Sequence, residues 1–409
     1  MHSILIIGKV WPEENTTGAG VRMMQILTSL SKSEYQITFA CAAQTNEHST
    51  DLKNLGVKTE RIQLNCNSFN SFVKALNPEI VLFDRFSTEE QFGWRIQEEL
   101  PNSLRILDTE DLHFLRAARE KTFKQVGFPY SHEQTIESAL ELDITYREIA
   151  AMLRCDVNLI ISKFEVQILK RHFPIPETQF FYLPLLPFGD KVNLSFSERK
   201  DFIFAGNFLH QPNKDAFHYL HLLWPKIKQL LPDVNICIYG AYADNSILHL
   251  NNVKSGFIVQ GWVEDLTTEI AKSRMLIAPL RFGAGLKSKI LEALNVGTPV
   301  ATTSIGAEGI EQKSNFSGVI GDCDDEWMSA IVNIYKNESA WKPENAKALK
   351  TIYTKFQGKE LENFPVMIQA KLEQLASNRK NQFLQKLLLH ETLKSSKYLS
   401  KWIIEKNKA

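Results

Sequence analysis

A loop of small residues that leads into a predicted basic helix is the segment best suited to chemistry in this sequence. The loop holds Gly283, Ala284 and Gly285, with Arg281 before it and Lys287 after it. Backbone amides of such a loop and of a helix N-terminus bind phosphate oxygens, and the two basic side chains add full positive charge. This segment therefore predicts a phosphate-binding site, although lysines at such positions are often merely solvated surface residues.

A carboxylate follows in the same predicted helix. Glu292 lies five residues after Lys287, about a turn and a half along the helix. At that distance from a phosphate site, a carboxylate could accept hydrogen bonds from ribose hydroxyls. Glu292 and Lys287 together thus favour a nucleotide as the ligand.

A second group of reactive side chains follows a predicted strand at Leu104–Leu107. Asp111 and His113 lie close together there, and a carboxylate beside an imidazole can orient the ring and keep it ready to exchange a proton. Open α/β sheets bind ligands at the carboxyl ends of their strands, so both residues are candidates for catalysis. The alternative is that Asp108, Thr109 or Asp111 caps a helix that begins near His113.

Two further loops of small residues each lead from a predicted strand into a predicted helix. They contain Gly18, Ala19 and Gly20 in the first half of the chain, and Gly206 and Asn207 in the second. Small side chains let a ligand approach the amides of the helix, although a glycine can also simply ease a helix start. The first of these loops has neither the GxGxxG nor the Walker pattern. Asn213 or Asp215 is predicted to cap the helix that follows the second loop.

Short β-branched runs alternate with helix-period segments, which is typical of a parallel sheet with crossover helices. A first series of predicted strands comprises Ile4–Ile7, Gln36–Ala40, Ile80–Phe83, Leu104–Leu107 and Val157–Ile161. A second series comprises Phe202–Ala205, Val234–Tyr239, Met275–Ala278, Val300–Thr302 and Val319–Ile320. One long helical run is predicted from Glu133 to Leu153.

These elements predict an α/β protein with two Rossmann-like, doubly wound domains that face a cleft, followed by a C-terminal helical extension. All four loops described above would lie at strand ends that face this cleft. The predicted boundaries are 1–187 for the N-terminal domain, 188–200 for a linker, 201–340 for the C-terminal domain and 341–409 for helices with a basic tail.

The amino-acid composition limits the classes of protein to which this chain can belong. The chain has 409 residues, with 44% hydrophobic and 23% charged residues, as in soluble globular proteins of more than one domain. Its 47 basic and 47 acidic residues give a net charge of +0, which argues against a nucleic-acid partner. The five cysteines form no close pairs, and neither a signal peptide nor a long apolar stretch is present. We therefore expect free thiols and a cytoplasmic location.

The charge is unevenly distributed along the chain. Residues 371–409 contain nine Lys or Arg and three Asp or Glu, a net charge of +6, so the preceding residues carry a net charge of −6. Apolar residues such as those of Phe383–Leu389 and Trp402–Ile404 alternate with lysines in this tail. Such a segment predicts either a peripheral contact with an anionic membrane or helices that pack back on the first domain.

The second half resembles the donor domain of GT-B-fold retaining glycosyltransferases of family four, over about residues 202–325. The matching motifs are Ala205-Gly206-Asn207-Phe208, Pro212-Asn213-Lys214-Asp215-Ala216, Gly261-Trp262-Val263-Glu264-Asp265-Leu266, Ala278-Pro279-Leu280-Arg281-Phe282-Gly283-Ala284-Gly285-Leu286-Lys287, Glu292-Ala293, Gly297-Thr298-Pro299-Val300-Ala301-Thr302-Thr303 and Gly306-Ala307-Glu308-Gly309. The first half is similar to the acceptor domain of that family more loosely, through Gly18 to Gly20 and Asp108 to Arg116.

The resemblance implies a role for each candidate residue. Glu292 would contact the ribose, Lys287 and Arg281 would face the diphosphate, and His113, with Asp111 beside it, would approach the donor sugar. The other residues implied to bind the nucleotide sugar are Gly18, Ala19, Gly20, Gly206, Asn207, Gly283, Ala284, Gly285 and Leu286. No metal and no cofactor is implied, because lysine, arginine and helix amides neutralise the leaving diphosphate.

The sequence departs from the family pattern at two places. Ala284 stands where a first glutamate is common, so that backbone amides around Gly283 to Gly285 are expected to bind sugar hydroxyls instead. Asn207 stands near the position of a common arginine, and Lys214 only approximately replaces a common lysine.

The implied activity is transfer of a sugar from a nucleotide-diphosphate sugar to an unidentified acceptor, which could be a polysaccharide, a lipid-linked glycan or a protein glycan. Retention at the anomeric carbon is expected. The alternatives are a nucleotide-sugar 2-epimerase on the same fold and a non-catalytic module that binds a nucleotide sugar. A lipid-linked acceptor and the basic tail would suit a peripheral position at the inner membrane face.

Overall fold

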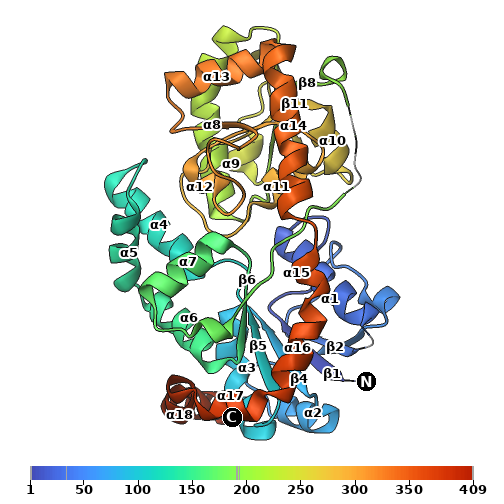
Figure 1. Ribbon diagram of the computed structural model, residues 1–409, viewed down its shortest axis with the longest axis vertical. Helices are drawn as coiled ribbons and strands as arrows, with labels where there is room; N and C mark the ends of the chain where they lie inside the picture. The colour runs from blue at the N-terminus through green and yellow to red at the C-terminus, as the bar shows by residue number, and fades with distance from the viewer. Residues whose placement is uncertain (1, 34, 190–191, 193, 408–409) are drawn as a thin grey trace.

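A seven-stranded parallel sheet forms the centre of the N-terminal domain, with the strand order β3-β2-β1-β4-β5-β6-β7 (Figure 1). The computed structural model describes residues 2–33, 35–189, 192 and 194–407, with 391–394 described by their backbone alone. In the sheet, Ile6 of β1 lies opposite Phe39 of β2 and Leu82 of β4. The strands are β1 Ser3–Gly8, β2 Gln36–Cys41, β3 Lys58–Arg61, β4 Ile80–Asp84, β5 Leu104–Asp108, β6 Val157–Ile160 and β7 Phe180–Tyr182.

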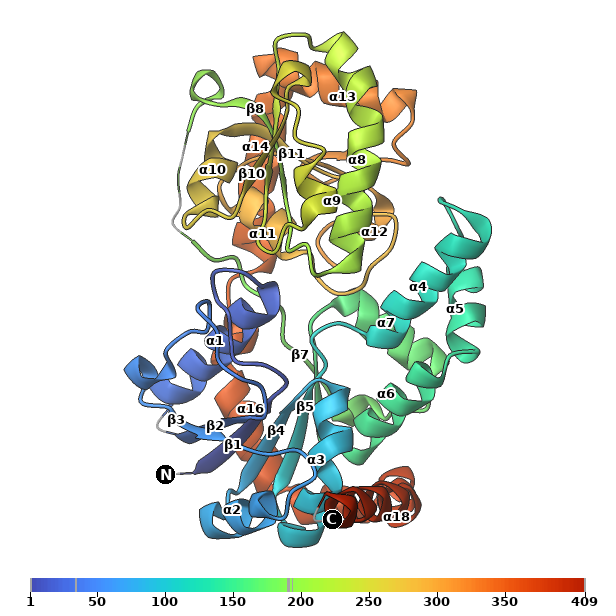
Figure 2. The same ribbon diagram turned by 180° about the vertical axis from the view of Figure 1, so that it is seen from behind.

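A six-stranded parallel sheet forms the centre of the C-terminal domain, with the strand order β10-β9-β8-β11-β12-β13. The central strands of both sheets are buried and strongly apolar, because helices cover the two faces of a doubly wound sheet. Figure 2 shows the two domains end to end along the long axis of the molecule. The strands are β8 Lys200–Ala205, β9 Ile236–Tyr239, β10 Phe257–Gly261, β11 Ser273–Ala278, β12 Val300–Thr302 and β13 Gly318–Ile320.

Helices flank both sheets. Those of the N-terminal domain are α1 Gly18–Lys32, α2 Ser68–Leu76, α3 Phe86–Glu99, α4 His113–Val126, α5 His132–Leu140, α6 Asp143–Arg154 and α7 Lys163–His172. Those of the C-terminal domain are α8 Gln211–Leu230, α9 Asn245–Leu248, α10 Leu266–Lys272, α11 Ser288–Asn295, α12 Ser304–Ala307, α13 Asp325–Lys336 and α14 Glu338–Lys355. The predicted architecture of two Rossmann-like domains is confirmed.

All the predicted strands are present, but β3, β7 and β10 were not predicted. Each of them is at an edge of its sheet. The four residues of β3 are Lys, Thr, Glu and Arg, and all are exposed, so no apolar pattern marks this strand. Only three residues form β7. Edge strands are commonly short or charged, which removes the signal that identifies central strands.

The predicted helix from Glu133 to Leu153 is wrong, because the structure has two helices there, α5 and α6. The chain turns at Glu141 and Leu142, and the amide of Leu142 donates to the carbonyl of Ala139. The side-chain hydroxyl of Thr145 donates to the same carbonyl at 2.6 Å. Both segments have helical periodicity. Because the turn between them is only two residues long, the hydrophobic pattern of the sequence does not reveal it.

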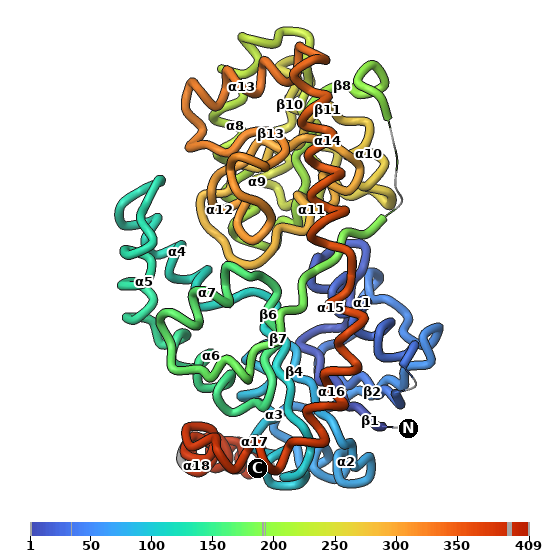
Figure 3. The backbone as a smooth tube through the Cα atoms, viewed as in Figure 1, coloured from blue at the N-terminus to red at the C-terminus, as the bar shows by residue number. Residues whose placement is uncertain are grey.

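The C-terminal helices divide between the two domains, as the backbone trace in Figure 3 shows. The predicted boundary at residue 340 falls inside α14, which packs on α11 and α13 of the C-terminal domain. The chain then crosses to the N-terminal domain, where Phe364 and Ile368 join the core beside β1. The helices after the crossing are α15 Lys359–Glu362, α16 Phe364–Glu373, α17 Leu375–Lys380 and α18 Phe383–Lys406.

Three further predictions concern the linker, the cysteines and membrane-spanning helices. Residues 190, 191 and 193 of the predicted linker lie outside the described part of the chain. The five cysteines are free thiols, as expected. Among the described residues, no helix combines the length and the apolar character needed to span a bilayer.

Candidate active site

A cavity of about 740 Å³ lies between the two domains, at the carboxyl ends of the central strands of both sheets. Loops after β1 and β4 line one side, and loops after β8 and β11 line the other. The strand order of each sheet reverses between these pairs of strands, and open α/β sheets bind ligands at such reversal points. The predicted residues that line the cavity are Gly18, Ala19, Gly20, Asp111, His113, Gly206, Asn207, Gly283, Ala284, Gly285, Leu286 and Lys287.

Two helix N-termini from different domains meet at this cavity. Thr17 caps α1, and its hydroxyl accepts a hydrogen bond from the amide of Gly20 at 2.9 Å. A side chain at Gly18 would place its Cβ only 2.9 Å from the Cβ of Ser288, the first residue of α11, so this close approach requires glycine. The positive ends of both helix dipoles are thus available to an anion in the cavity.

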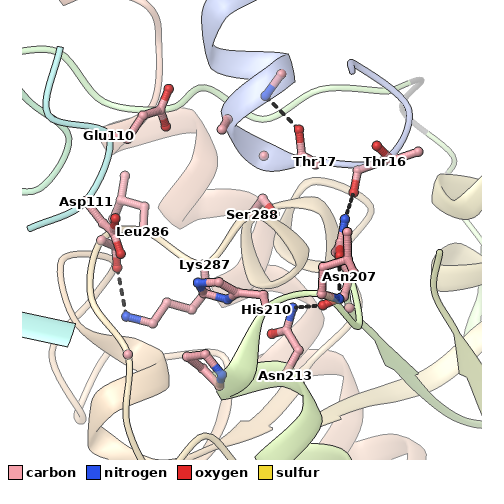
Figure 4. A pocket seen from close by; sticks show the side chains of 18 of the residues that line it. Thr16, Thr17, Glu110, Asp111, Asn207, His210, Asn213, Leu286, Lys287 and Ser288 are labelled. Carbon is pink, nitrogen blue, oxygen red and sulfur yellow. Dashed lines mark hydrogen bonds between the residues drawn. The ribbon is translucent and has the colours of Figure 1, made fainter. Parts of the chain in front are cut away.

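Lys287 lies at the start of α11 and extends along the cavity wall (Figure 4). Its Nζ donates a hydrogen bond to the carbonyl of Gly285 at 2.8 Å. Burial lowers the pKa of Lys287 to about 8, against the opposing attraction of Glu308. At neutral pH this side chain is therefore a cation, although one that titrates more readily than an exposed lysine.

The loop before Lys287 is shaped by its contact with the N-terminal domain. Gly285 has φ of +66°, and a Cβ there would lie 2.8 Å from the Cβ of Asp111, so the position requires glycine. The Gly285 amide donates to Oε1 of Glu165 in α7 at 2.8 Å. This amide was expected, with its neighbours, to bind sugar hydroxyls, but a carboxylate of the other domain already occupies it.

Asp111 and His113 form a contact inside the cavity. Oδ1 of Asp111 lies 3.3 Å from Nε2 of His113, and its Oδ2 accepts from Arg116 at 2.5 Å. Burial would raise the pKa of Asp111, but Arg116 and His113 outweigh burial and bring it to about 2. Burial lowers the pKa of His113 to about 4, against the attraction of Asp111. At pH 7 the pair is therefore a carboxylate beside a neutral imidazole.

The capping alternative for this segment is wrong. The N-cap of α4 is Leu112, which provides no side-chain cap. The carboxylate of Glu148 in α6 accepts from the amides of His113 and Phe114 at 3.1 and 2.7 Å instead, and Glu165 accepts from the amide of Leu112 at 3.1 Å. Because distant residues satisfy these amides, Asp111 remains available to the cavity.

Arg281 lies outside the cavity lining, contrary to its predicted position facing a diphosphate. Its guanidinium binds both carboxylate oxygens of Asp215, at 2.9 and 2.6 Å. It is also stacked against two aromatic rings, with its Cζ 4.5 Å from the ring centroid of Phe123 and 4.3 Å from that of Tyr219. A planar bidentate pair held between two rings is a stable alternative to a ligand contact.

Glu292 also lies outside the cavity lining, although it was predicted to contact the ribose. Its side chain is buried, and Oε1 accepts from Nζ of Lys289 at 2.7 Å. Burial raises the pKa of Glu292, and Lys289 partly offsets that effect. The residue of this pair that does line the cavity is Lys289.

Asn207 joins the two domains at the cavity wall. Its Nδ2 donates to the carbonyl of Thr16 at 3.4 Å, and its own carbonyl accepts from Nδ2 of Asn213 at 2.9 Å. The predicted capping of α8 by Asn213 or Asp215 is therefore wrong, since the N-cap is His210 and it makes no side-chain cap bond. Pro212, near the start of α8, has no amide hydrogen that a cap would need to satisfy.

Two basic residues to which the sequence assigned no individual role meet across the cavity. A guanidinium nitrogen of Arg116 in α4 lies 3.3 Å from Nε2 of His210, at the start of α8 (Figure 4 labels His210). Both line the cavity. Burial lowers the pKa of His210 to about 4, as does the charge of Arg116, so His210 is neutral at pH 7. Arg116 thus brings a cation close to the loop after β8, which contains Asn207.

An ion pair fastens the domains together beside the cavity. Arg119 in α4 donates to both carboxylate oxygens of Glu308 at 2.7 and 2.6 Å, and to the carbonyl of Gly283 at 2.7 Å. The side chains are 3% and 17% exposed. Breaking a buried pair by removing one partner costs about 3–5 kcal/mol, because the other charge stays buried without a partner.

We therefore expect an Arg119→Met variant to shift the equilibrium between closed and open domains by about a hundredfold or more toward the open form. Small-angle scattering would detect this as a larger radius of gyration and a longer maximum dimension. The Arg119→Met/Glu308→Leu double variant removes both charges and should recover part of the loss. A single variant with an unchanged scattering curve would contradict the role of this pair.

The sequence and the structure of this chain were compared with those of known proteins. Residues 199–337 match the family model of glycosyl transferases group 1. No curated protein matches the sequence.

Many solved structures share the fold, and all three described here are distant in sequence. TarM of Staphylococcus aureus has a TM-score of 0.67 at 9% identity, with 90% of this chain and 100% of that chain covered. The pneumococcal O-GlcNAc transferase GtfA has a TM-score of 0.67 at 10% identity, over 91% and 99% of the chains. HepE of Anabaena has a TM-score of 0.63 at 12% identity, over 92% and 100%. Residues 199–337 are therefore a glycosyl transferases group 1 domain, and the chain that carries this domain on a GT-B fold is a glycosyltransferase.

Proposed function

We propose that the protein transfers a sugar from a nucleotide-diphosphate sugar to a glycan or lipid-linked acceptor, with retention at the anomeric carbon and without a bound metal. The observation that carries the proposal is the convergence of Lys287 and two helix N-termini on one cavity between the domains. Such an arrangement stabilises the negative charge that develops on a departing diphosphate. TarM, GtfA and HepE were solved with UDP, which makes UDP-sugars the first donors to test.

In the proposed reaction, the bond between the anomeric carbon and the diphosphate oxygen breaks as the acceptor hydroxyl oxygen bonds to that carbon. The hydroxyl proton leaves with the diphosphate, so that the products are a glycoside and a protonated nucleoside diphosphate. Asp111, an anion at neutral pH, stabilises the positive charge at the anomeric carbon. His113, a neutral ring beside it, hydrogen-bonds a hydroxyl of the donor sugar.

A screen of UDP-, GDP- and ADP-sugars tests this proposal. We expect one donor to raise the melting temperature and to release its nucleoside diphosphate slowly without acceptor, and equally fast with EDTA. The anomeric coupling constant of the glycoside in proton NMR then reports retention or inversion. An epimerised nucleotide sugar from donor alone would instead favour the 2-epimerase, and binding without hydrolysis or transfer would favour the non-catalytic module.

The pH dependence should report the titration of Lys287. Since the pKa of this lysine is about 8 and its charged form binds the diphosphate, kcat/KM should fall as the pH rises through about 8. A Lys287→Arg variant should lack this descending limb, because arginine stays charged. Initial rates at subsaturating donor between pH 6 and 10 measure both profiles, and identical alkaline limbs would contradict the assignment.

A lipid-linked glycan is one of the proposed acceptors. For such an acceptor we propose a cytoplasmic location with peripheral contact at the inner membrane face. Its support is the net charge of +6 in residues 371–409. Positive segments of this kind are attracted to anionic lipids.

A further inference from the structure

The last helix, α18, packs on the N-terminal domain through polar side chains. It lies against α3 and α6. Nε2 of Gln385 donates to the carbonyl of Arg154 at 3.2 Å and to Oδ1 of Asp156 at 3.0 Å. At the other end of the helix, Ser400 accepts from Arg95 at 3.1 Å and donates to Asn65 at 3.0 Å. Gln385 and Ser400 are only 2% and 5% exposed, so the inner face of the helix is partly built from hydrogen bonds.

Large apolar side chains occupy the outer face of the same helix. Phe383, Leu387, Tyr398 and Trp402 are 72%, 45%, 65% and 60% exposed. At 3.6 residues per turn, these four positions fall within an arc of about 100° on one side of the helix. A surface helix normally places its apolar stripe toward the core and its polar side toward water. Here three aromatic rings and a leucine face outward while Gln385 and Ser400 face inward, which indicates that another apolar phase covers the outer face.

Basic residues outnumber acidic ones along this helix, which has five lysines and two glutamates. Lys386 and Lys401 are exposed beside the outer face, and Nζ of Lys406 lies 5.2 Å from the centroid of the Trp402 ring. Tryptophan and tyrosine rings favour the level of lipid headgroups, and lysines flanking an apolar face favour anionic lipids. The −6 charge of the rest of the chain makes this segment the part of the protein that an anionic surface attracts.

We propose that the outer face of α18 docks on an anionic lipid bilayer, with the apolar side chains of Phe383, Leu387, Tyr398 and Trp402 in the headgroup region and the lysines against the anionic headgroups. This goes beyond the proposed function by assigning the contact to one face of one helix. The docking itself does not depend on the transfer reaction.

The position of the helix determines what such docking does. Figures 1 and 2 both show α18 at the end of the N-terminal domain that is farthest from the C-terminal domain. The cavity lies at the opposite end of the N-terminal domain, between the domains. Docking through α18 therefore tethers the enzyme and leaves the cavity open to the aqueous side. If the proposed lipid-linked acceptor is correct, its glycan must span the height of the N-terminal domain to reach the cavity.

Vesicle sedimentation with the full chain, in the absence of any nucleotide sugar, tests the docking. We expect binding to vesicles that contain phosphatidylglycerol and phosphatidylcholine, and at least about tenfold weaker binding to phosphatidylcholine alone. A Leu387→Ser/Tyr398→Ser variant should bind anionic vesicles at least about tenfold more weakly than the wild type. A Lys386→Gln/Lys401→Gln variant should lose affinity for anionic vesicles only.

A matched control is available on the same chain. Leu222 and Tyr353 are 71% and 74% exposed and lie on α8 and α14 of the other domain. A Leu222→Ser/Tyr353→Ser variant removes the same residue types from an unrelated surface, so it should bind vesicles like the wild type. Unchanged melting temperatures of the variants would show that the loss of binding is not unfolding.

Three outcomes would overturn the proposal. One is a wild type that does not sediment with anionic vesicles, and another is an equal loss of binding in the matched Leu and Tyr double variants. The third is a concentration-dependent dimer in light scattering that Leu387→Ser/Tyr398→Ser makes monomeric, without vesicle binding, since a second copy would then cover this face. Donor hydrolysis, measured separately in solution, should be equal in all variants, so a failure of the proposed transfer activity is recognised independently.

Discussion

Replacement of Lys287 by alanine is expected to lower kcat for sugar transfer by about a hundredfold to a thousandfold. Removal of one preorganised group that stabilises developing charge has effects of this size. Lys287 lines the cavity, starts α11 and lies beside the glycine loop that contacts Asp111. Its charge is therefore close both to the amides at the start of α11 and to the expected position of the anomeric carbon.

The effect should appear in kcat more than in donor affinity. The negative charge on the bridging diphosphate oxygen grows as the glycosidic bond breaks, so a cation there is worth more in the transition state than in the ground state. Steady-state kinetics with saturating acceptor, together with calorimetric titration of the nucleoside diphosphate, separates the two quantities. A drop in affinity with unchanged kcat would mean that Lys287 only binds the donor.

A lysine of the same domain provides the control for this prediction. Lys272 in α10 forms an ion pair with Glu269 at 2.8 Å and does not line the cavity. A Lys272→Ala variant should therefore keep the turnover of the wild type. Unchanged turnover in Lys287→Ala as well would remove Lys287 from the proposed mechanism.

The largest expected effect on stability is that of Arg22→Met, at about 3–5 kcal/mol of unfolding free energy. Arg22 is 1% exposed, in α1 directly behind the cavity wall. Its guanidinium binds Asp108 at 2.8 Å and also donates to the carbonyl of Leu183. Without it, the fully buried carboxylate of Asp108 would have no guanidinium partner.

The neighbours of Asp108 increase this cost. Burial and the charge of Asp108 raise the pKa of Glu110 well above its usual range, and burial raises the pKa of Asp84. Loss of the Arg22 charge therefore leaves a buried group of carboxyls with less compensation. We expect the N-terminal domain of the variant to unfold at a lower urea concentration than that of the wild type. Tryptophan fluorescence and circular dichroism measure this unfolding transition.

Arg147 is the matched control for Arg22. It forms a bidentate pair with Glu90 at 2.9 and 2.7 Å in the same domain, but its side chain is 48% exposed. An Arg147→Met variant should change the unfolding free energy by about 0–1 kcal/mol, since water screens exposed pairs. Equal losses in both variants would show that burial does not decide the contribution of these arginines.

The central strands of both sheets and the cavity loops could be predicted from the sequence for a common reason. Buried parallel strands are runs of β-branched residues, and the loops after β1, β8 and β11 carry glycine where chains approach closely. Gly18 faces Ser288, and Gly285 faces Asp111, across the two domains. A lack of side chains at these positions is visible in the sequence even though the neighbour that requires it is not.

The partners of charged side chains could not be predicted in this way. Arg281 and Glu292 match motif positions. In the structure, however, Arg281 is bound by Asp215 and two aromatic rings, and Glu292 is bound by Lys289. Arg116, by contrast, received no predicted role and lies 3.3 Å from His210 of the other domain. A long charged side chain can reach several possible partners. Which partner it binds depends on which helices and strands pack together.

The sequence by itself determined the class of this protein: two doubly wound domains, a glycine loop followed by Lys287, and a basic C-terminal segment. These features depend on residue type and spacing, which are local properties of the chain. Only the tertiary structure decided that Arg119 fastens the two domains, that Asp111 lies against Gly285, and that α18 turns its aromatic residues outward. Each of these depends on contacts between segments far apart in the sequence, where packing of the whole fold selects one pairing among many.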